Sequence, residues 1–120
     1  MLEQEGYDLM GAAFEVYNVL GYGMAEEIYQ QSLEIEPGLR KIPFQSKAEL
    51  DVTYKDQKLT TTYRPDLLVF EIVVELKAVK TLAPEHEAQL FNYMRISKRK
   101  VGYLMNFGAS GELEWKRFVL

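Results

Sequence analysis

The sequence contains no cysteine and only one histidine among its 120 residues. The absence of cysteine excludes a disulfide-stabilised fold, a zinc site built from thiolates and a cysteine nucleophile. No segment approaches the ~20 consecutive apolar residues that a membrane-spanning helix requires, and residues 1–5 are acidic where a signal peptide is basic. We therefore expect a cytoplasmic protein without a membrane partner.

An excess of positive charge is also missing. The 18 acidic residues outnumber the 14 basic residues, which gives a net charge of −4 at pH 7. Proteins that bind phosphate backbones through overall charge are usually basic, so any nucleic acid would have to be bound by a local group of cations. With 48% hydrophobic residues, a chain of this length can bury one apolar core without disulfides or structural zinc. The sequence predicts one domain that covers residues 1–120.

The hydrophobic pattern predicts the element order ααβββαββ. Helical spacing of apolar residues predicts helices over residues 2–20, 24–36 and 84–97, the second of them stopped by Pro37-Gly38. Alternating polarity and β-branched residues predict strands over residues 44–54, 58–69, 72–79, 101–107 and 113–119, with turns at residues 55–57 and 108–111. The strand over residues 72–79 is almost wholly apolar, which is typical of a strand at the centre of a sheet.

Two charged residues interrupt this apolar strand. Glu75 and Lys77 lie on the same face of it, and burial of such side chains requires compensation. A tight hairpin around residues 70–71 places Asp66 directly opposite Glu75. Facing carboxylates repel each other unless one takes a proton or a cation lies between them. A magnesium ion would satisfy the pair, with Lys77 directed at the attacking water or at a phosphate, which is an arrangement suited to phosphodiester hydrolysis.

An ordinary structural interpretation of the same charges stays open at this point. Asp66 can pair with Arg64, and Glu75 can pair with Lys77, as salt bridges on a solvated sheet face. The hairpin register is open as well, because Phe70-Glu71 lacks the Asn, Asp or Gly that two-residue turns prefer, and a three-residue loop would displace the pairing.

The combination of Pro65-Asp66 with Glu75-Leu76-Lys77 resembles the PD-(D/E)XK nuclease superfamily. More narrowly, the segment Gly23-Met24-Ala25-Glu26-Glu27-Ile28-Tyr29 resembles the signature of the small bacterial GxxExxY proteins. Further segments follow in that family's order: Ile42-Pro43-Phe44, Tyr63-Arg64-Pro65-Asp66, Val74-Glu75-Leu76-Lys77-Ala78-Val79, His86-Glu87-Ala88-Gln89-Leu90 and Asn106-Phe107-Gly108. The resemblance covers nearly the whole chain. It implies an α/β (α+β) fold with a restriction-endonuclease-like core, in which helices flank a mixed central β-sheet.

The resemblance also implies roles for single residues. Asp66 and Glu75 would bind Mg²⁺, with Mn²⁺ as a possible substitute, and Lys77 would orient or activate water. Glu26 would support the metal from the first predicted turn of its helix. An acidic residue in that turn also has a structural explanation, because its negative charge interacts favourably with the exposed main-chain N–H groups at the start of a helix.

Gln89 and Tyr93 form a Gln-x-x-x-Tyr motif on the helix over residues 84–97. The motif resembles that of the recombination-repair exonuclease branch, in which these residues help hold the site and the substrate. A spacing of four places the two side chains on one helical face. For Tyr93 we favour simple packing against the core. The single histidine, His86, lies at the start of this helix and is interpreted as a structural or substrate-side group.

The function expected from the resemblance is a magnesium-dependent nuclease that hydrolyses nucleic acid, with DNA as the favoured substrate. The alternative is a catalytically weak interaction module that acts with a nucleic-acid-processing partner. A homodimer or another protein partner is compatible with both. Seven basic residues are candidates for phosphate contacts or plain solvated surface: Lys80, Arg95, Lys98, Arg99, Lys100, Lys116 and Arg117.

Overall fold

The computed structural model describes all 120 residues. Its elements, in chain order, are α1 (Glu3–Leu20), α2 (Glu26–Leu33), α3 (Glu36–Leu39), β1 (Phe44–Ser46), β2 (Leu50–Tyr54), β3 (Gln57–Tyr63), β4 (Leu67–Val69), β5 (Ile72–Lys77), α4 (Pro84–Ser97), β6 (Val101–Asn106) and β7 (Glu114–Val119). The predicted helix over residues 84–97 is confirmed at both ends. None of the helices is long and apolar enough to cross a membrane.

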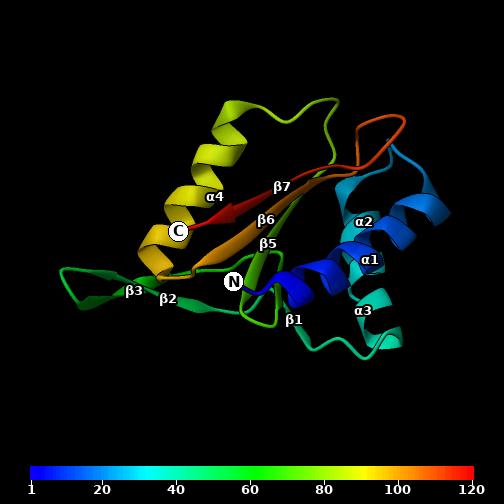
Figure 1. Cartoon of the computed structure of the whole chain (residues 1–120). Helices are drawn as coiled ribbons and strands as arrows, with labels where there is room; N and C mark the ends of the chain where they lie inside the picture. The colour runs from blue at the N-terminus through cyan, green and yellow to red at the C-terminus, as the bar shows by residue number, and fades with distance from the viewer.

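Five strands form a mixed sheet in the order β1-β4-β5-β6-β7 (Figure 1). The central position predicted for residues 72–79 is confirmed, because β5 has β4 antiparallel on one side and β6 parallel on the other. Parallel neighbours require a crossover connection. Helix α4 supplies that connection, so it is held against the sheet beside the strand that it follows.

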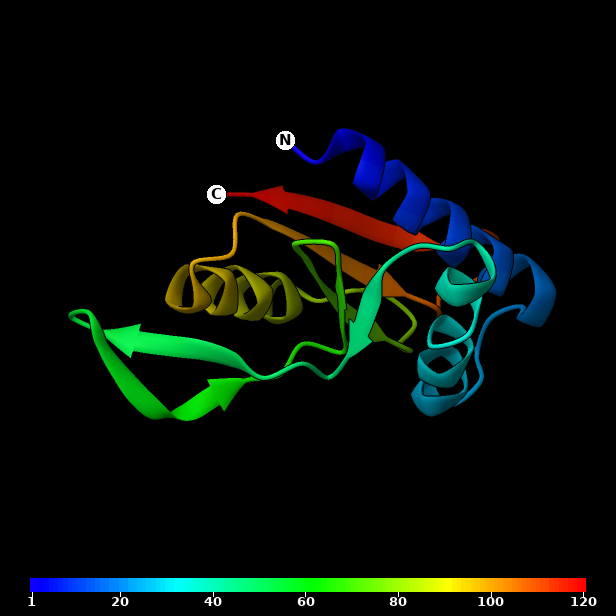
Figure 2. The same ribbon diagram turned by 90° about the horizontal axis from the view of Figure 1, so that it is seen from below.

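Helices cover both faces of this sheet, as Figure 2 shows with α1 on one side and α4 on the other. On the α1 side, 19 buried residues form one apolar cluster, which includes Ile72, Val74 and Leu76 of β5. On the α4 side, a cluster of nine buried residues includes Val73 of β5 and Leu90 of α4. Successive side chains of a strand point to opposite faces. Glu75 and Lys77 therefore share the α4 side with Val73.

The predicted helix over residues 24–36 is confirmed for residues 26–33 and is wrong at its C-terminal end. Helix α2 ends at Leu33, and Pro37 with Gly38 lies inside the short helix α3. Proline is tolerated in the first turn of a helix, where its missing N–H would have no partner. Pro37-Gly38 therefore does not stop a helix here, although the sequence pattern suggested it.

Two of the predicted strands are each divided in two. The strand over residues 44–54 bends at Lys47, which has a left-handed φ of 52°. The strand over residues 58–69 is interrupted at residues 64–66, where Pro65 has no N–H to contribute to a sheet. As a result β2 and β3 leave the main sheet and pair with each other. Their predicted turn is confirmed at Lys55-Asp56, whereas Gln57 already belongs to β3.

Candidate active site

The hairpin of β4 and β5 has the register that the sequence predicted for a two-residue turn. Leu67 pairs with Val74, and Val69 pairs with Ile72, so the next position places Asp66 opposite Glu75. The turn forms because Phe70 adopts a left-handed φ of 53°, a conformation that is uncommon for residues other than glycine. Phe70 packs against the core, and its N–H donates to the carbonyl of Pro43 at 3.3 Å. Tertiary contacts thus support a turn that local sequence preference disfavours.

Main-chain amides hold the two facing carboxylates in place. The N–H of Asp66 donates to Oε1 of Glu75 at 3.0 Å, and the N–H of Leu76 donates to Oδ2 of Asp66 at 2.8 Å. The carbonyl of Asp66 in turn accepts a hydrogen bond of 2.9 Å from the buried side chain of Gln30 on α2. Each carboxylate is therefore oriented through one oxygen. The other oxygen of each receives no hydrogen bond from the protein.

Both carboxylates line one open pocket of about 300 Å³ on the α4 side of the sheet. All five residues predicted for the site, namely Glu26, Asp66, Glu75, Lys77 and Gln89, line this pocket. They come from α2, the start of β4, β5 and α4. Residues far apart in the sequence are thus brought together in the combination that the motifs predicted.

The charges in the pocket are not neutralised by ion pairs. Neither salt bridge of the structural interpretation is present, because Arg64 pairs with Glu49 and Lys77 forms no ion pair. Burial, and next the charge of Asp66, raises the pKa of Glu75 to about 7. Burial and the charge of Asp66 also raise the pKa of Glu26, although the nearby Lys77 opposes this shift. The pocket therefore concentrates negative charge that a cation would stabilise.

The donor set of the pocket suits a hard divalent cation. No three His, Asp or Glu side chains lie close enough together to enclose a metal ion. Mg²⁺, however, is commonly held through one or two carboxylates, with waters and a substrate phosphate at its other positions. Asp66 and Glu75 meet that requirement, each with one oxygen unused by the protein. Glu26, whose side chain is exposed, lies where it could act on an ion through water.

Tyr93 packs against the core cluster on the α4 side, as favoured from the sequence, and it also faces the pocket. It is half-buried, it lines the pocket, and its ring stacks on that of Tyr63 at 4.4 Å between centroids. Tyr29, by contrast, has a purely structural position. Its hydroxyl donates to the carbonyl of Gly21 at 2.7 Å, and its ring stacks on Phe107.

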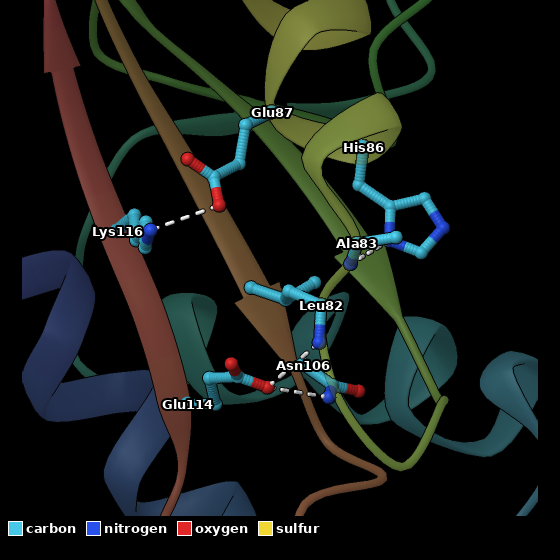
Figure 3. A network of polar contacts seen from close by, with 7 residues as sticks. All are labelled: Leu82, Ala83, His86, Glu87, Asn106, Glu114 and Lys116. Carbon is cyan, nitrogen blue, oxygen red and sulfur yellow. Dashed lines mark hydrogen bonds and ion pairs between the residues drawn. The ribbon is translucent and has the colours of Figure 1, made fainter.

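A buried polar network fixes the chain that follows Lys77 (Figure 3). Asn106 is fully buried, and its Oδ1 accepts hydrogen bonds from the N–H groups of Val79 at 2.9 Å and Gly108 at 3.0 Å. Its Nδ2 donates to Glu114 at 2.9 Å, and the same carboxylate oxygen accepts from the N–H of Leu82 at 3.1 Å. Because every member has a partner, the network positions the segment between β5 and α4.

The start of α4 is fixed in the same way (Figure 3). His86 accepts a hydrogen bond from the N–H of Ala83 through Nδ1 at 3.0 Å, which caps the helix and confirms the structural interpretation of this histidine. Glu87 pairs with Lys116 on β7 at 2.8 Å. A side chain at Gly108 would come within 2.2 Å of the carbonyl oxygen of Val79. Only glycine therefore permits the close approach of residue 108 to the chain that follows β5.

Two of the supporting residues, Gln30 and Asn106, had no predicted role. Gln30 and Asn106 are polar residues within apolar surroundings, but nothing in the sequence shows which main-chain groups they meet. The predicted basic residues lie elsewhere, since none of the seven lines the pocket. Three of them form ion pairs with other acids: Lys98 with Asp56, Arg99 with Glu71, and Lys116 with Glu87.

Comparisons with known proteins agree with this fold. The family model described as the PD-(D/E)XK nuclease superfamily matches residues 3–118. No curated protein matches the sequence. A solved structure named "Crystal structure of SSO0001" is similar with a TM-score of 0.53 and 16% sequence identity, over 98% of this chain and 59% of that chain. This likeness concerns the fold, and the chain spans about three-fifths of that protein. The narrower resemblance to GxxExxY proteins stays a prediction.

Proposed function

The chain belongs to the PD-(D/E)XK nuclease superfamily and has a restriction-endonuclease-like fold, and from this premise we propose that it is a magnesium-dependent nuclease acting on nucleic acid, with DNA as the favoured substrate. One observation carries the proposal. Asp66 and Glu75 face each other in one pocket, each oriented by a main-chain N–H, beside a lysine that no acid neutralises. A merely structural group of charges would be expected to form ion pairs.

The roles of the residues follow from their chemistry. Asp66 and Glu75 would hold the ion, and Glu26 would support it through water. The bound ion would lower the pKa of a water molecule and stabilise charge on the phosphate. The ammonium group of Lys77 can donate to the attacking water and to a phosphate oxygen, which orients the first and stabilises charge that develops on the second. The amide of Gln89 can bind the substrate at the edge of the pocket.

The test is cleavage by the purified protein of labelled single-stranded and duplex DNA, and of RNA, with Mg²⁺, with Mn²⁺ and with EDTA. We expect cleavage that requires the ion and disappears in Asp66→Ala. Lys58→Met, an exposed substitution on β3 outside the pocket, is the control and should cleave as the wild type does. Melting curves of both variants should confirm that they are folded. Cleavage that persists in EDTA or in Asp66→Ala would contradict the proposal.

The acidic total favours one second candidate. The net charge is −4, and three of the seven basic residues considered for phosphate contacts are paired with acids. Such a surface favours weak binding to nucleic acid and thus an interaction module that acts with a nucleic-acid-processing partner, or as a homodimer. In the same assay this candidate predicts no cleavage of any substrate by the folded wild type with either ion.

A further inference from the structure

The hydroxyl of Tyr63 is the one buried side-chain polar atom of this protein that has no hydrogen-bond partner. Tyr63 ends β3, three residues before Asp66, and its side chain is only 4% exposed. A buried hydroxyl without a partner lowers stability, because it has given up its hydrogen bonds to water without replacing them. Phenylalanine would fill the same apolar space without that cost, so the position calls for an explanation.

The surroundings of Tyr63 point toward the proposed active site. The residue lines the same pocket as Glu75 and Asp66. Its ring lies parallel to that of Tyr93, with 4° between the planes, and the half-buried Tyr93 lines the pocket as well. This stack restricts the ring, so the hydroxyl keeps its direction. The hydroxyl, which has no partner of its own, is therefore available to donate to a group in the pocket.

Glu75 has an acceptor to match this donor. One of its oxygens accepts from the N–H of Asp66, and its second oxygen has no protein partner. A carboxylate accepts stronger hydrogen bonds than a neutral group does, and a buried donor close to it gains most from that difference. Groups that hydrogen-bond to metal-binding side chains also fix the orientation of those side chains.

We propose that Tyr63 is a positioning residue whose hydroxyl donates a hydrogen bond to the Glu75 carboxylate in the working site and so fixes the orientation in which Glu75 meets the ion. The inference rests on the proposed function. It adds to the superfamily motif a residue from outside that motif, carried by the small β2–β3 sheet rather than by the main sheet.

The variant Tyr63→Phe tests the inference, because it keeps the buried ring and the stack on Tyr93 and removes only the hydroxyl. We expect an unchanged or higher melting temperature. We expect Mn²⁺ binding to weaken by about 10-fold in calorimetry, the size typical for the loss of a partner to a metal-binding side chain. The kcat for DNA should fall by a similar factor, with KM unchanged. Tyr54→Phe removes a hydroxyl from a side chain on β2 that is 64% exposed and should match the wild type.

Other results would overturn the inference. Mn²⁺ binding at the wild-type affinity would do so, and a higher KM with unchanged Mn²⁺ binding would assign the hydroxyl to the substrate instead. A wild type that binds no Mn²⁺ would end the proposed function alone. The positioning role can then be tested on the metal-free protein. Without the hydroxyl, Glu75 is less restrained and should accept a weaker hydrogen bond from the N–H of Asp66. The amide proton resonance of Asp66 should move upfield in Tyr63→Phe, and an unmoved resonance would refute the positioning role.

Discussion

The two faces of the central sheet differ in what they are built to do. On the α1 side, 19 buried residues form a continuous apolar cluster. On the α4 side the cluster has only nine buried residues. Strand β5 contributes Val73 to it, whereas Glu75 and Lys77 on the same face line the pocket. One strand therefore supplies stability through one set of alternate residues and the proposed chemistry through the other. The comparison shows that charges can be placed on a central strand when its opposite face supplies the burial.

The comparison also explains how the charges stay in place. On the α1 side apolar contact is enough, because such packing needs no direction. On the α4 side, directed hydrogen bonds hold the Glu75 and Asp66 carboxylates and the Asn106 network. Substitutions on the two faces should consequently have different effects.

Lys77→Met should have the largest effect, and only on activity. It removes the ammonium group from the pocket while its methylene chain is largely replaced, so folding should be retained. We expect kcat for DNA cleavage to fall about 10²–10³-fold, the usual cost of losing one group that stabilises the transition state. Urea unfolding should show wild-type stability. A folded variant with normal kcat would remove the lysine from the proposed mechanism.

Leu76→Ala, one residue away on the opposite face, should show the reverse. Leu76 is 1% exposed and belongs to the large cluster. Truncation of such a leucine costs about 2–5 kcal/mol through lost burial and the cavity that remains. Urea unfolding should report this loss, whereas kcat per folded molecule should stay close to wild type. A stability near that of the wild type would contradict the division in which the α1 side supplies stability and the α4 side supplies the proposed chemistry.

Asn106→Ala should be destabilising by about 1–3 kcal/mol, because it leaves the half-buried N–H groups of Val79 and Gly108 without their acceptor. The segment between β5 and α4 should also become more accessible, which faster amide hydrogen exchange at residues 78–83 would reveal. Asn92→Ala, at an exposed position on α4, is the matched control. Equal amide hydrogen exchange in the two variants would show that the network does not position this segment.

The smallest effect is a pH dependence of the stability of the metal-free protein. The pKa of Glu75 is raised to about 7 in the folded state from an ordinary value of 4.5. The folded state therefore keeps its proton where the unfolded chain has lost it, so this group contributes stability below pH 4.5 that is lost as the pH rises to about 7. The free energy of unfolding should fall over this range by an amount on the order of 2 kcal/mol.

Two variants sharpen that measurement. Glu75→Gln keeps an acceptor for the Asp66 amide but cannot ionise, so it should lack this decrease and be more stable than wild type above pH 7. Asp66→Asn removes the neighbouring charge and should reduce the decrease, with a melting temperature no lower than that of the wild type. Glu112→Gln, an exposed substitution outside the pocket, should keep the wild-type profile. A large loss of stability in metal-free Asp66→Asn would make Asp66 a structural residue.

The parts of the fold that the sequence predicted are those with a local cause. Helix α4 begins at Pro84, where proline suits the first turn, and the turn at Lys55-Asp56 lies between two alternating segments. The predictions failed where a residue is compatible with more than one local structure. Pro37 can end a helix or begin one, and only the packing of α3 against α1 shows which occurs. The division of the strand at Pro65 likewise depends on which sheet each half joins.

The sequence by itself determined which residues could form the site, because the spacing of Pro65-Asp66 and Glu75-Leu76-Lys77 permits one register in which the two acids face each other. It also determined that β5 is central, since a nearly continuous apolar strand is stable only when both of its faces are covered. The tertiary structure alone decided that Phe70 turns the chain, that Lys77 stays unpaired and that Tyr63 lines the same pocket as Glu75. The physical reason is that periodicity is a property of neighbours along the chain, whereas hydrogen bonds and ion pairs depend on which distant groups the fold brings within a few ångströms.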